Sequence, residues 1–168
     1  MITMSVEKSI ENSIEKPNRQ YVSILGMNMH EEESTRDKME QLHIELNHLV
    51  GAGNTDYLVW GQYIEAHWDE FYESPYLNVS FLTELSIHVS LEVVAEDIHK
   101  VIDLVAIAKQ KKSVKAIRYA DKIVNDLNGW LYNPNQEDDV YWGATATLQG
   151  DGDQKVIRRI NKFINNNR

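Results

Sequence analysis

Residues 84–109 read ELSIHVSLEVVAEDIHKVIDLVAIAK, and the conformation of this stretch decides the fold class of the chain. At its start, apolar side chains take every second position: Leu85, Ile87, Val89, Leu91 and Val93. A period of two is typical of a half-buried strand. An apolar stripe with helical spacing also runs through the stretch, formed by Ile87, Leu91, Val94, Ile98, Ile102 and Val105. We expect a strand followed by a helix from Glu96 to about Lys109, with one long helix over 79–109 as the alternative.

Two other segments carry the signal of a strand. Residues 20–29, QYVSILGMNM, hold β-branched and aromatic residues without a helical period. Residues 140–148, VYWGATATL, alternate in the same way as the start of the first stretch. Together with 85–93 they predict a small sheet.

The remaining segments indicate amphipathic helices, bounded by caps and by glycine or proline. We expect helices from Ser34 or Thr35 to about Val50, from the Asn54-Thr55 cap to Glu73, from Ser113 to about Trp130, and over Gln154–Ile164. The predicted fold is therefore a helix-rich α+β domain of about five amphipathic helices with a small sheet. The alternative is an all-α helical bundle. Residues 1–19 are expected to form a flexible N-terminal arm, and 20–168 a single globular domain.

Several classes of protein are excluded by what the 168 residues lack. The chain has no cysteine, which rules out disulfides, thiolate metal sites and cysteine nucleophiles. The N-terminal segment has no continuous apolar run, and no stretch of 18 apolar residues occurs. We therefore expect no membrane contact and a cytoplasmic location, in a bacterium or during phage infection.

Charge is segregated along the chain, although the net charge is −9. Residues 100–122 carry seven basic and two acidic side chains, and residues 154–168 carry five basic and no acidic ones. These two segments together hold a charge of +10, so the rest of the chain holds −19. Such segregation creates a field that can steer charged partners.

Two Glu-x-x-His motifs raise the question of a metal site: Glu45 with His48, and Glu96 with His99. In di-iron bundles this spacing directs both ligands into the core. At about 100° per residue, His48 instead points roughly 160° away from the apolar side of its helix. We therefore expect no metal, no cofactor and no catalytic residue, and a metal-binding bundle enzyme is the least favoured function.

Two smaller features have structural interpretations. His67 lies within an aromatic stripe of its predicted helix, as expected for a buried histidine with a structural hydrogen bond. The turn Gly150-Asp151-Gly152-Asp153 precedes a basic helix, which would repel a cation, so Asp153 is expected to cap that helix instead of binding calcium.

Basic side chains line the polar faces of the two C-terminal helices. The residues are Lys111, Lys115, Arg118, Lys122, Lys155, Arg158, Arg159 and Lys162. Two such stripes are typical of a surface that grips phosphates. Against this interpretation, aromatic residues do not interleave with the basic ones, and the total charge opposes binding of a polyanion. Pairing with the chain's own acidic helices would also account for the stripes.

Acidic and aromatic residues form the other candidate surface. Its residues are Glu65, Asp69, Glu73, Glu137, Asp138, Asp139, Tyr141 and Trp142. Aromatic side chains flanked by carboxylates suit recognition of a basic protein. The favoured hypothesis is an inhibitor or an immunity or anti-defence protein that neutralises a basic nuclease or toxin. The alternative is a nucleic-acid or phosphate binder that uses the basic stripes.

Overall fold

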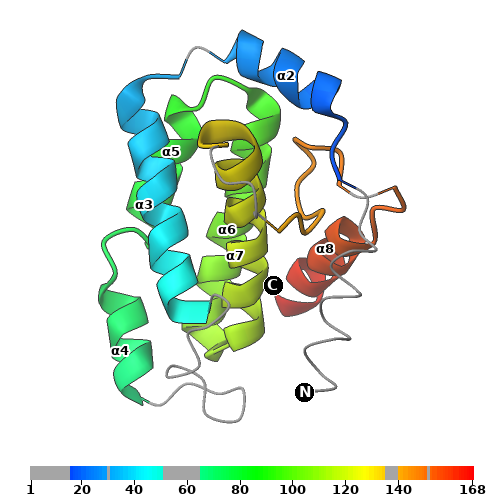
Figure 1. Ribbon diagram of the computed structural model, residues 1–168. Helices are drawn as coiled ribbons and strands as arrows, with labels where there is room; N and C mark the ends of the chain where they lie inside the picture. The colour runs from blue at the N-terminus through cyan, green and yellow to red at the C-terminus, as the bar shows by residue number, and fades with distance from the viewer. Residues whose placement is uncertain (1–15, 30, 51–64, 135–139, 151) are drawn as a thin grey trace, which may run out of the picture.

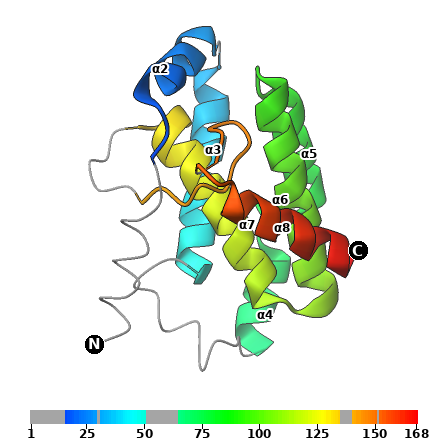
Figure 2. The same cartoon turned by 90° about the vertical axis from the view of Figure 1, so that its right-hand side faces the viewer.

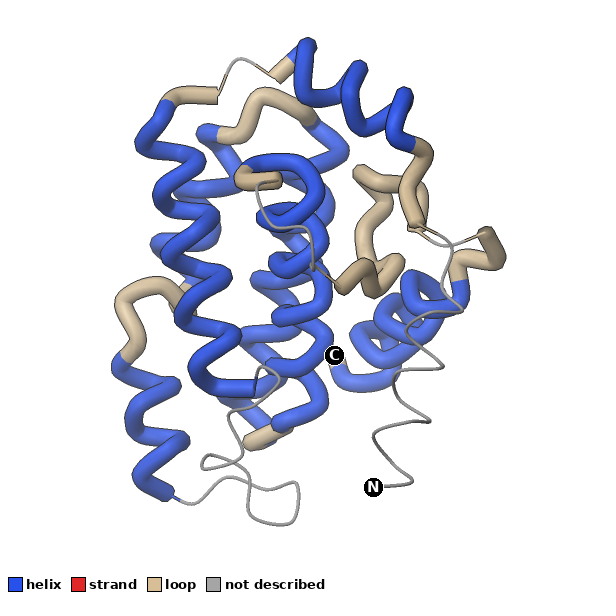
Figure 3. The backbone as a smooth tube through the Cα atoms, viewed as in Figure 1, coloured by secondary structure: helices blue, strands red, loops and turns tan. Residues whose placement is uncertain are grey.

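A computed structural model describes residues 16–29, 31–50, 65–134, 140–150 and 152–168. Of these residues 75% are helical and none is in a strand, as Figure 3 shows. The helix-rich prediction is confirmed. The small sheet expected from 20–29, 85–93 and 140–148 is wrong, because each segment takes another conformation. Most of the expected N-terminal arm lies outside the described residues, as does the predicted Asn54-Thr55 helix start.

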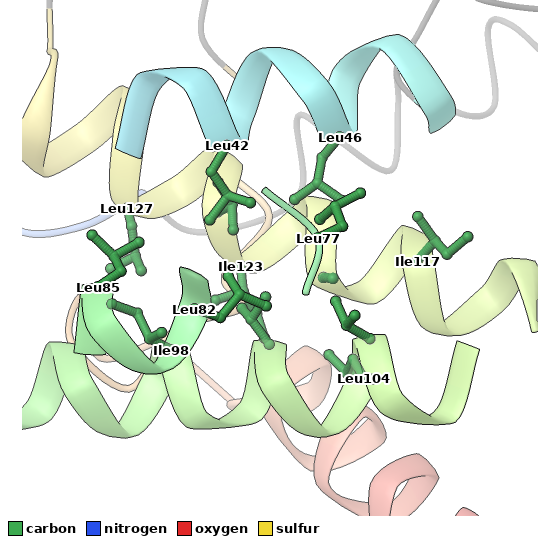
Figure 4. Close-up of a cluster of buried hydrophobic side chains, with 14 of the residues drawn as sticks. Leu42, Leu46, Leu77, Leu82, Leu85, Ile98, Leu104, Ile117, Ile123 and Leu127 are labelled. Atoms are coloured by element: carbon green, nitrogen blue, oxygen red, sulfur yellow. The ribbon is translucent and has the colours of Figure 1, made fainter. Parts of the chain in front are cut away.

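Four helices form the core of the described structure. They are α3 (Glu33–Val50), α5 (Val79–His88), α6 (Glu92–Lys111) and α7 (Val114–Leu127). α6 packs against both α5 and α7, and α3 packs on α7 (Figure 1). Their apolar faces meet in the cluster of Figure 4, which includes Leu42, Leu46, Leu82, Leu85, Ile98, Leu104, Ile117, Ile123 and Leu127. The apolar faces predicted for α3 and α7 from their helical period are the faces that these helices bury in the core.

Shorter elements lie around these four helices. They are α2 (Arg19–Asn28), α4 (Glu65–Glu73), the π-helical turn η2 (Asn128–Tyr132) and α8 (Lys155–Asn167). α2 packs on η2, and α8 packs on α6, which it crosses in Figure 2. Ser113 caps α7 as expected, since its hydroxyl accepts the N–H of Ala116 at 3.2 Å. In the part of the chain that the structure describes, no helix is long and apolar enough to cross a membrane.

Residues 85–93 form neither a strand nor part of one continuous helix over 79–109, so both of these expectations are wrong, whereas the helix expected from Glu96 to about Lys109 is confirmed within α6. The chain turns between α5 and α6, and Val89 N–H closes α5 on the carbonyl of Leu85. Across the turn, the N–H of Ser90 donates to Oε1 of Glu31 at 2.7 Å. The apolar alternation fails because Ile87 is 73% exposed while Leu85 is fully buried. The turn folds the stretch into a helical hairpin.

Residues 20–29 form helix α2 instead of a strand, and a cap at the start accounts for the difference. Oδ1 of Asn18 accepts the N–H groups of Gln20 at 2.9 Å and Tyr21 at 3.3 Å. These are two of the N–H groups that the first turn of a helix leaves without partners. The β-branched and aromatic residues therefore sit in a helix that the preceding asparagine starts.

Residues 140–150 form an irregular segment whose backbone binds two buried carboxylates instead of a neighbouring strand. Asp126, on α7, accepts the N–H groups of Trp142 and Ala144, each at 2.9 Å. Asp97, on α6, accepts those of Ala146 at 3.0 Å and Thr147 at 2.9 Å. We call residues 140–150 the anchored segment. Buried backbone N–H groups need partners, and here the two carboxylates fill the place of a sheet.

The start of α8 also differs from the expectation. Gln154 precedes the helix in a left-handed conformation and provides no side-chain cap. Asp153 lies one residue earlier and pairs with Lys155 at 3.5 Å. The assignment of Asp153 as the helix cap is therefore wrong, because the left-handed residue displaces it from the capping position.

Candidate anion-binding face

Helices α7 and α8 are joined by an aromatic contact on the protein surface. The rings of Tyr119 and Phe163 meet edge to face, with centroids 5.3 Å apart. Both side chains are half-buried, and both pack on the hydrophobic core. Because each ring is fixed from below by the core, the contact sets how the polar faces of the two helices lie beside each other.

Two lysines of α7 lie over these rings and over a third one. Lys115 Nζ is 5.7 Å from the centroid of Tyr119 and 5.6 Å from that of Phe163. Lys122 Nζ is 5.7 Å from Tyr119 and 4.8 Å from Trp142, which the anchored segment supplies. Both lysines are within the ~6 Å range of a cation–π contact. Cations and rings therefore alternate across this surface.

We call this surface the basic–aromatic face, and it comprises Lys115, Arg118, Tyr119, Lys122, Trp142, Arg159, Lys162 and Phe163. The expectation that no aromatic residue interleaves with the basic stripes is wrong, because Tyr119 and Phe163 lie among the basic residues of α7 and α8 themselves, and the anchored segment adds Trp142. Among the described residues, no carboxylate lies within ion-pair distance of any cation of this face. The cations are therefore not occupied by the chain's own described acidic side chains.

Lys122 is the most buried cation of the face. Burial lowers its pKa, and the nearby positive charges of Arg159 and Arg118 lower it further. Asp121 and Asp126 act in the opposite direction. Like charges held together repel one another, and an anion placed among them would relieve that repulsion.

A pocket of about 280 Å³ opens at one end of this face. Its lining includes both rings of the α7–α8 contact and the cations Lys115, Arg159 and Lys162. Asn166 and Asn167 add amide groups to its rim. The pocket thus presents aromatic, cationic and amide groups within one small volume.

The other basic residues of the two predicted stripes lie outside this pocket. Lys111 donates to Oδ1 of Asn167 at 3.3 Å, and Lys155 pairs with Asp153. Arg158 is exposed, and on the helical wheel of α8 it lies about 140° from Phe163. The structure therefore brings together only part of each stripe.

The described residues of the predicted acidic surface lie in two separate places. Asp69 and Glu73 are exposed on α4, at the left edge of Figure 1, whereas the anchored segment lies on the right. Glu65 begins α4, and its side chain is outside the described part. Glu137, Asp138 and Asp139 also lie outside the described residues.

The two aromatic residues expected to contact a protein partner have other surroundings. Tyr141 is 3% exposed, and its hydroxyl donates to the carbonyl of Gly150. Because it is buried, a contact with a partner through Tyr141 is excluded in this conformation. Trp142 is half-buried beneath Lys122, so it belongs to the basic–aromatic face.

The Glu-x-x-His motifs do not converge. His48 is exposed on α3, and its Nε2 lies 3.0 Å from Oε1 of Glu70 on α4. Glu96 and His99 are exposed on α6. Within the described ranges, no group of three or more histidine or acidic side chains is arranged to hold a metal ion. His67, expected to be buried, is half-buried on α4.

Sequence reasoning missed Tyr119, Phe163 and Asn166 as members of a site. Spacing along each helix was the available signal, because residues three and four apart share a face. Tyr119 is four residues after Lys115, and Phe163 is four residues after Arg159. What the spacing does not show is that the two faces meet.

Comparison with known proteins found no matching family model, curated protein or solved structure.

Proposed function

We propose that the protein binds nucleic acid through the phosphates, using the basic–aromatic face. The observation that carries the proposal is the convergence of five cations with three aromatic rings, without a carboxylate in ion-pair distance among the described residues. Lysine and arginine contacts to phosphate supply most of the affinity of proteins for nucleic acid. Rings among the cations are typical of surfaces that also contact bases.

The net charge of −9 does not oppose this proposal. At physiological salt the Debye length is about 8 Å, so more distant charges are largely screened. Helix α4, which carries the exposed Asp69 and Glu73, lies at the left edge of Figure 1, whereas α8 lies on the right. The local charge of the face therefore governs contact with a phosphate backbone.

The test compares two arginines that neighbour each other on α8. Arg159 lines the pocket, whereas Arg158 is exposed and lies outside the pocket lining. Replacement by glutamine removes one positive charge in both cases, so the two variants differ only in the position of the lost charge. We expect Arg159→Gln to weaken binding of a labelled oligonucleotide, measured by fluorescence anisotropy, more than Arg158→Gln does. When the logarithm of the binding constant is plotted against the logarithm of the salt concentration, the slope for Arg159→Gln should be smaller in magnitude than that of the wild type by about 0.7–0.9, as for the loss of one phosphate contact. No binding by the wild-type protein, even at low salt, would refute the proposal.

Binding of a basic protein at α4 is a second candidate. Asp69 and Glu73 are exposed there, and Tyr72 between them is 38% exposed. Charge complementarity at such a surface mainly speeds association. If a basic protein is recovered by pull-down, reversing both charges to lysine should slow its association at low salt and leave the affinity for oligonucleotides no weaker. An unchanged association rate would remove the support for an acidic contact surface.

A further inference from the structure

The pocket between α7 and α8 has the chemistry of a site for one nucleotide. Tyr119 and Phe163 provide flat apolar surface, and Lys115, Arg159 and Lys162 provide positive charge. A nucleotide combines a flat base with a phosphate. The volume of about 280 Å³ lies just under the ~300 Å³ at which pockets for drug-sized molecules begin, so the pocket suits a single small unit.

Resting on the proposed function, we infer that the basic–aromatic face binds single-stranded nucleic acid, with one base held in this pocket. The faces of the bases in a duplex are stacked on their neighbours, and only the base edges are reachable in the grooves. An unpaired base can instead lie against an aromatic side chain. A site that contains rings as well as cations should therefore bind a single strand more tightly than a duplex.

Lys115 now lies over the ring of Phe163, 5.6 Å from the centroid, where a base would pack. Cation–π contacts at exposed sites are weak, and Lys115 is exposed. A phosphate beside Arg159 and Lys162 offers this lysine a charged partner. Binding would therefore move the ammonium group from the ring to the phosphate and leave the ring for the base.

A second pair of ring and cation continues the surface beyond the pocket. Trp142 lies 4.8 Å from Lys122 Nζ, and Tyr119 contacts both Lys122 and Lys115. The two pairs therefore form a continuous path through Tyr119. Two successive positions of this kind suit consecutive nucleotides of a strand better than one free nucleotide.

The test uses Phe163→Leu, which keeps an apolar side chain against the core and removes the ring. Binding is measured by anisotropy for a labelled single-stranded oligonucleotide and a blunt duplex of equal length. Inorganic polyphosphate and a free mononucleotide serve as unlabelled competitors. Arg158→Gln is the control for loss of charge on α8 outside the pocket, and thermal melts establish that each variant is folded.

We expect the single strand to bind more tightly than the duplex, and Phe163→Leu to weaken it about fivefold or more, as for loss of one stacked base. Polyphosphate should compete equally well against both proteins, and the mononucleotide should compete only weakly. Equal affinity for strand and duplex, or no effect of Phe163→Leu, would overturn the inference and leave phosphate binding intact. If a mononucleotide competes as well as the strand, the conclusion that two ring and cation pairs contact consecutive nucleotides would be wrong. If neither strand, duplex nor polyphosphate binds, the proposed function itself fails.

Discussion

Asp121 and Asp126 lie five residues apart on α7 and differ in how their carboxylates are bound. Asp126 accepts two backbone N–H groups from the anchored segment, which offset only part of the effect of its burial. Oδ1 of Asp121 is buried and has no hydrogen-bond partner among the described residues. Burial raises the pKa of each carboxyl to about 7. Asp121 thus carries a cost of ionisation that fewer contacts offset.

These two pKa values predict that stability falls as pH rises from about 4 to about 7. In this window the unfolded chain releases the protons that the folded protein retains, so ionisation favours the unfolded state. Each pKa unit corresponds to about 1.4 kcal/mol, so the expected loss is on the order of a few kcal/mol. The free energy of unfolding, measured by denaturant titration at several pH values, tests this expectation.

The variant Asp121→Asn is expected to flatten part of this decline, because an amide has no proton to lose. It should therefore stabilise the protein at pH 8 relative to wild type and change little at pH 5. Asp126 still titrates in this variant, so a weaker slope remains. An equal loss of stability at both pH values would contradict the prediction, because the effect of the substitution would then not depend on the titration of Asp121.

At the scale of elements, the helices with a clear apolar period could be predicted, and the segments held by distant groups could not. Ser113 and the spacing of apolar residues in α7 are local signals. In the structure Ser113 caps the helix, and the apolar residues form its buried face. The alternation over 85–93 is also local, but a turn bound to Glu31 overrides it. The backbone partners of 140–148 are Asp97 and Asp126, on two other elements, and no property of the segment itself indicates them.

Gly150 ends the anchored segment in a backbone conformation that disfavours a side chain. Its φ of +64° is unfavourable for other residues, and an added Cβ would lie 2.6 Å from Cδ1 of Ile157. Gly150→Ala is therefore expected to destabilise the protein by about 1–2 kcal/mol or more. Gly26 in α2 is the matched control, since nothing lies within 4 Å of its added Cβ. There, Gly26→Ala should stabilise by about 0.5–1 kcal/mol. Thermal melts of the two variants should move in opposite directions, and a shift in the same direction would contradict the local geometry.

At the scale of the whole molecule, cations from α7 and α8 come together in one face. The cations of the candidate face could be predicted, because their spacing along α7 and α8 places them on the polar side of each helix. Tyr119 and Phe163 carry the same spacing signal, but their contact could not be predicted, because the two helices are separated in the chain by η2 and the anchored segment. Only the packing of α8 beside α7 makes one site of the two stripes.

The attachment of the anchored segment has a kinetic consequence for folding. Its docking site is made by Asp97 on α6 and Asp126 on α7, so it is complete only after these two helices have paired. The segment should therefore dock after the rate-limiting barrier, and substitutions in these contacts should have φ-values near zero. Asp97→Asn is expected to speed unfolding and leave the refolding rate nearly unchanged in stopped-flow chevrons. Leu104→Ala, in the buried core, should slow refolding by contrast. A refolding rate that falls with Asp97→Asn would instead mean that the segment helps to bring the helices together.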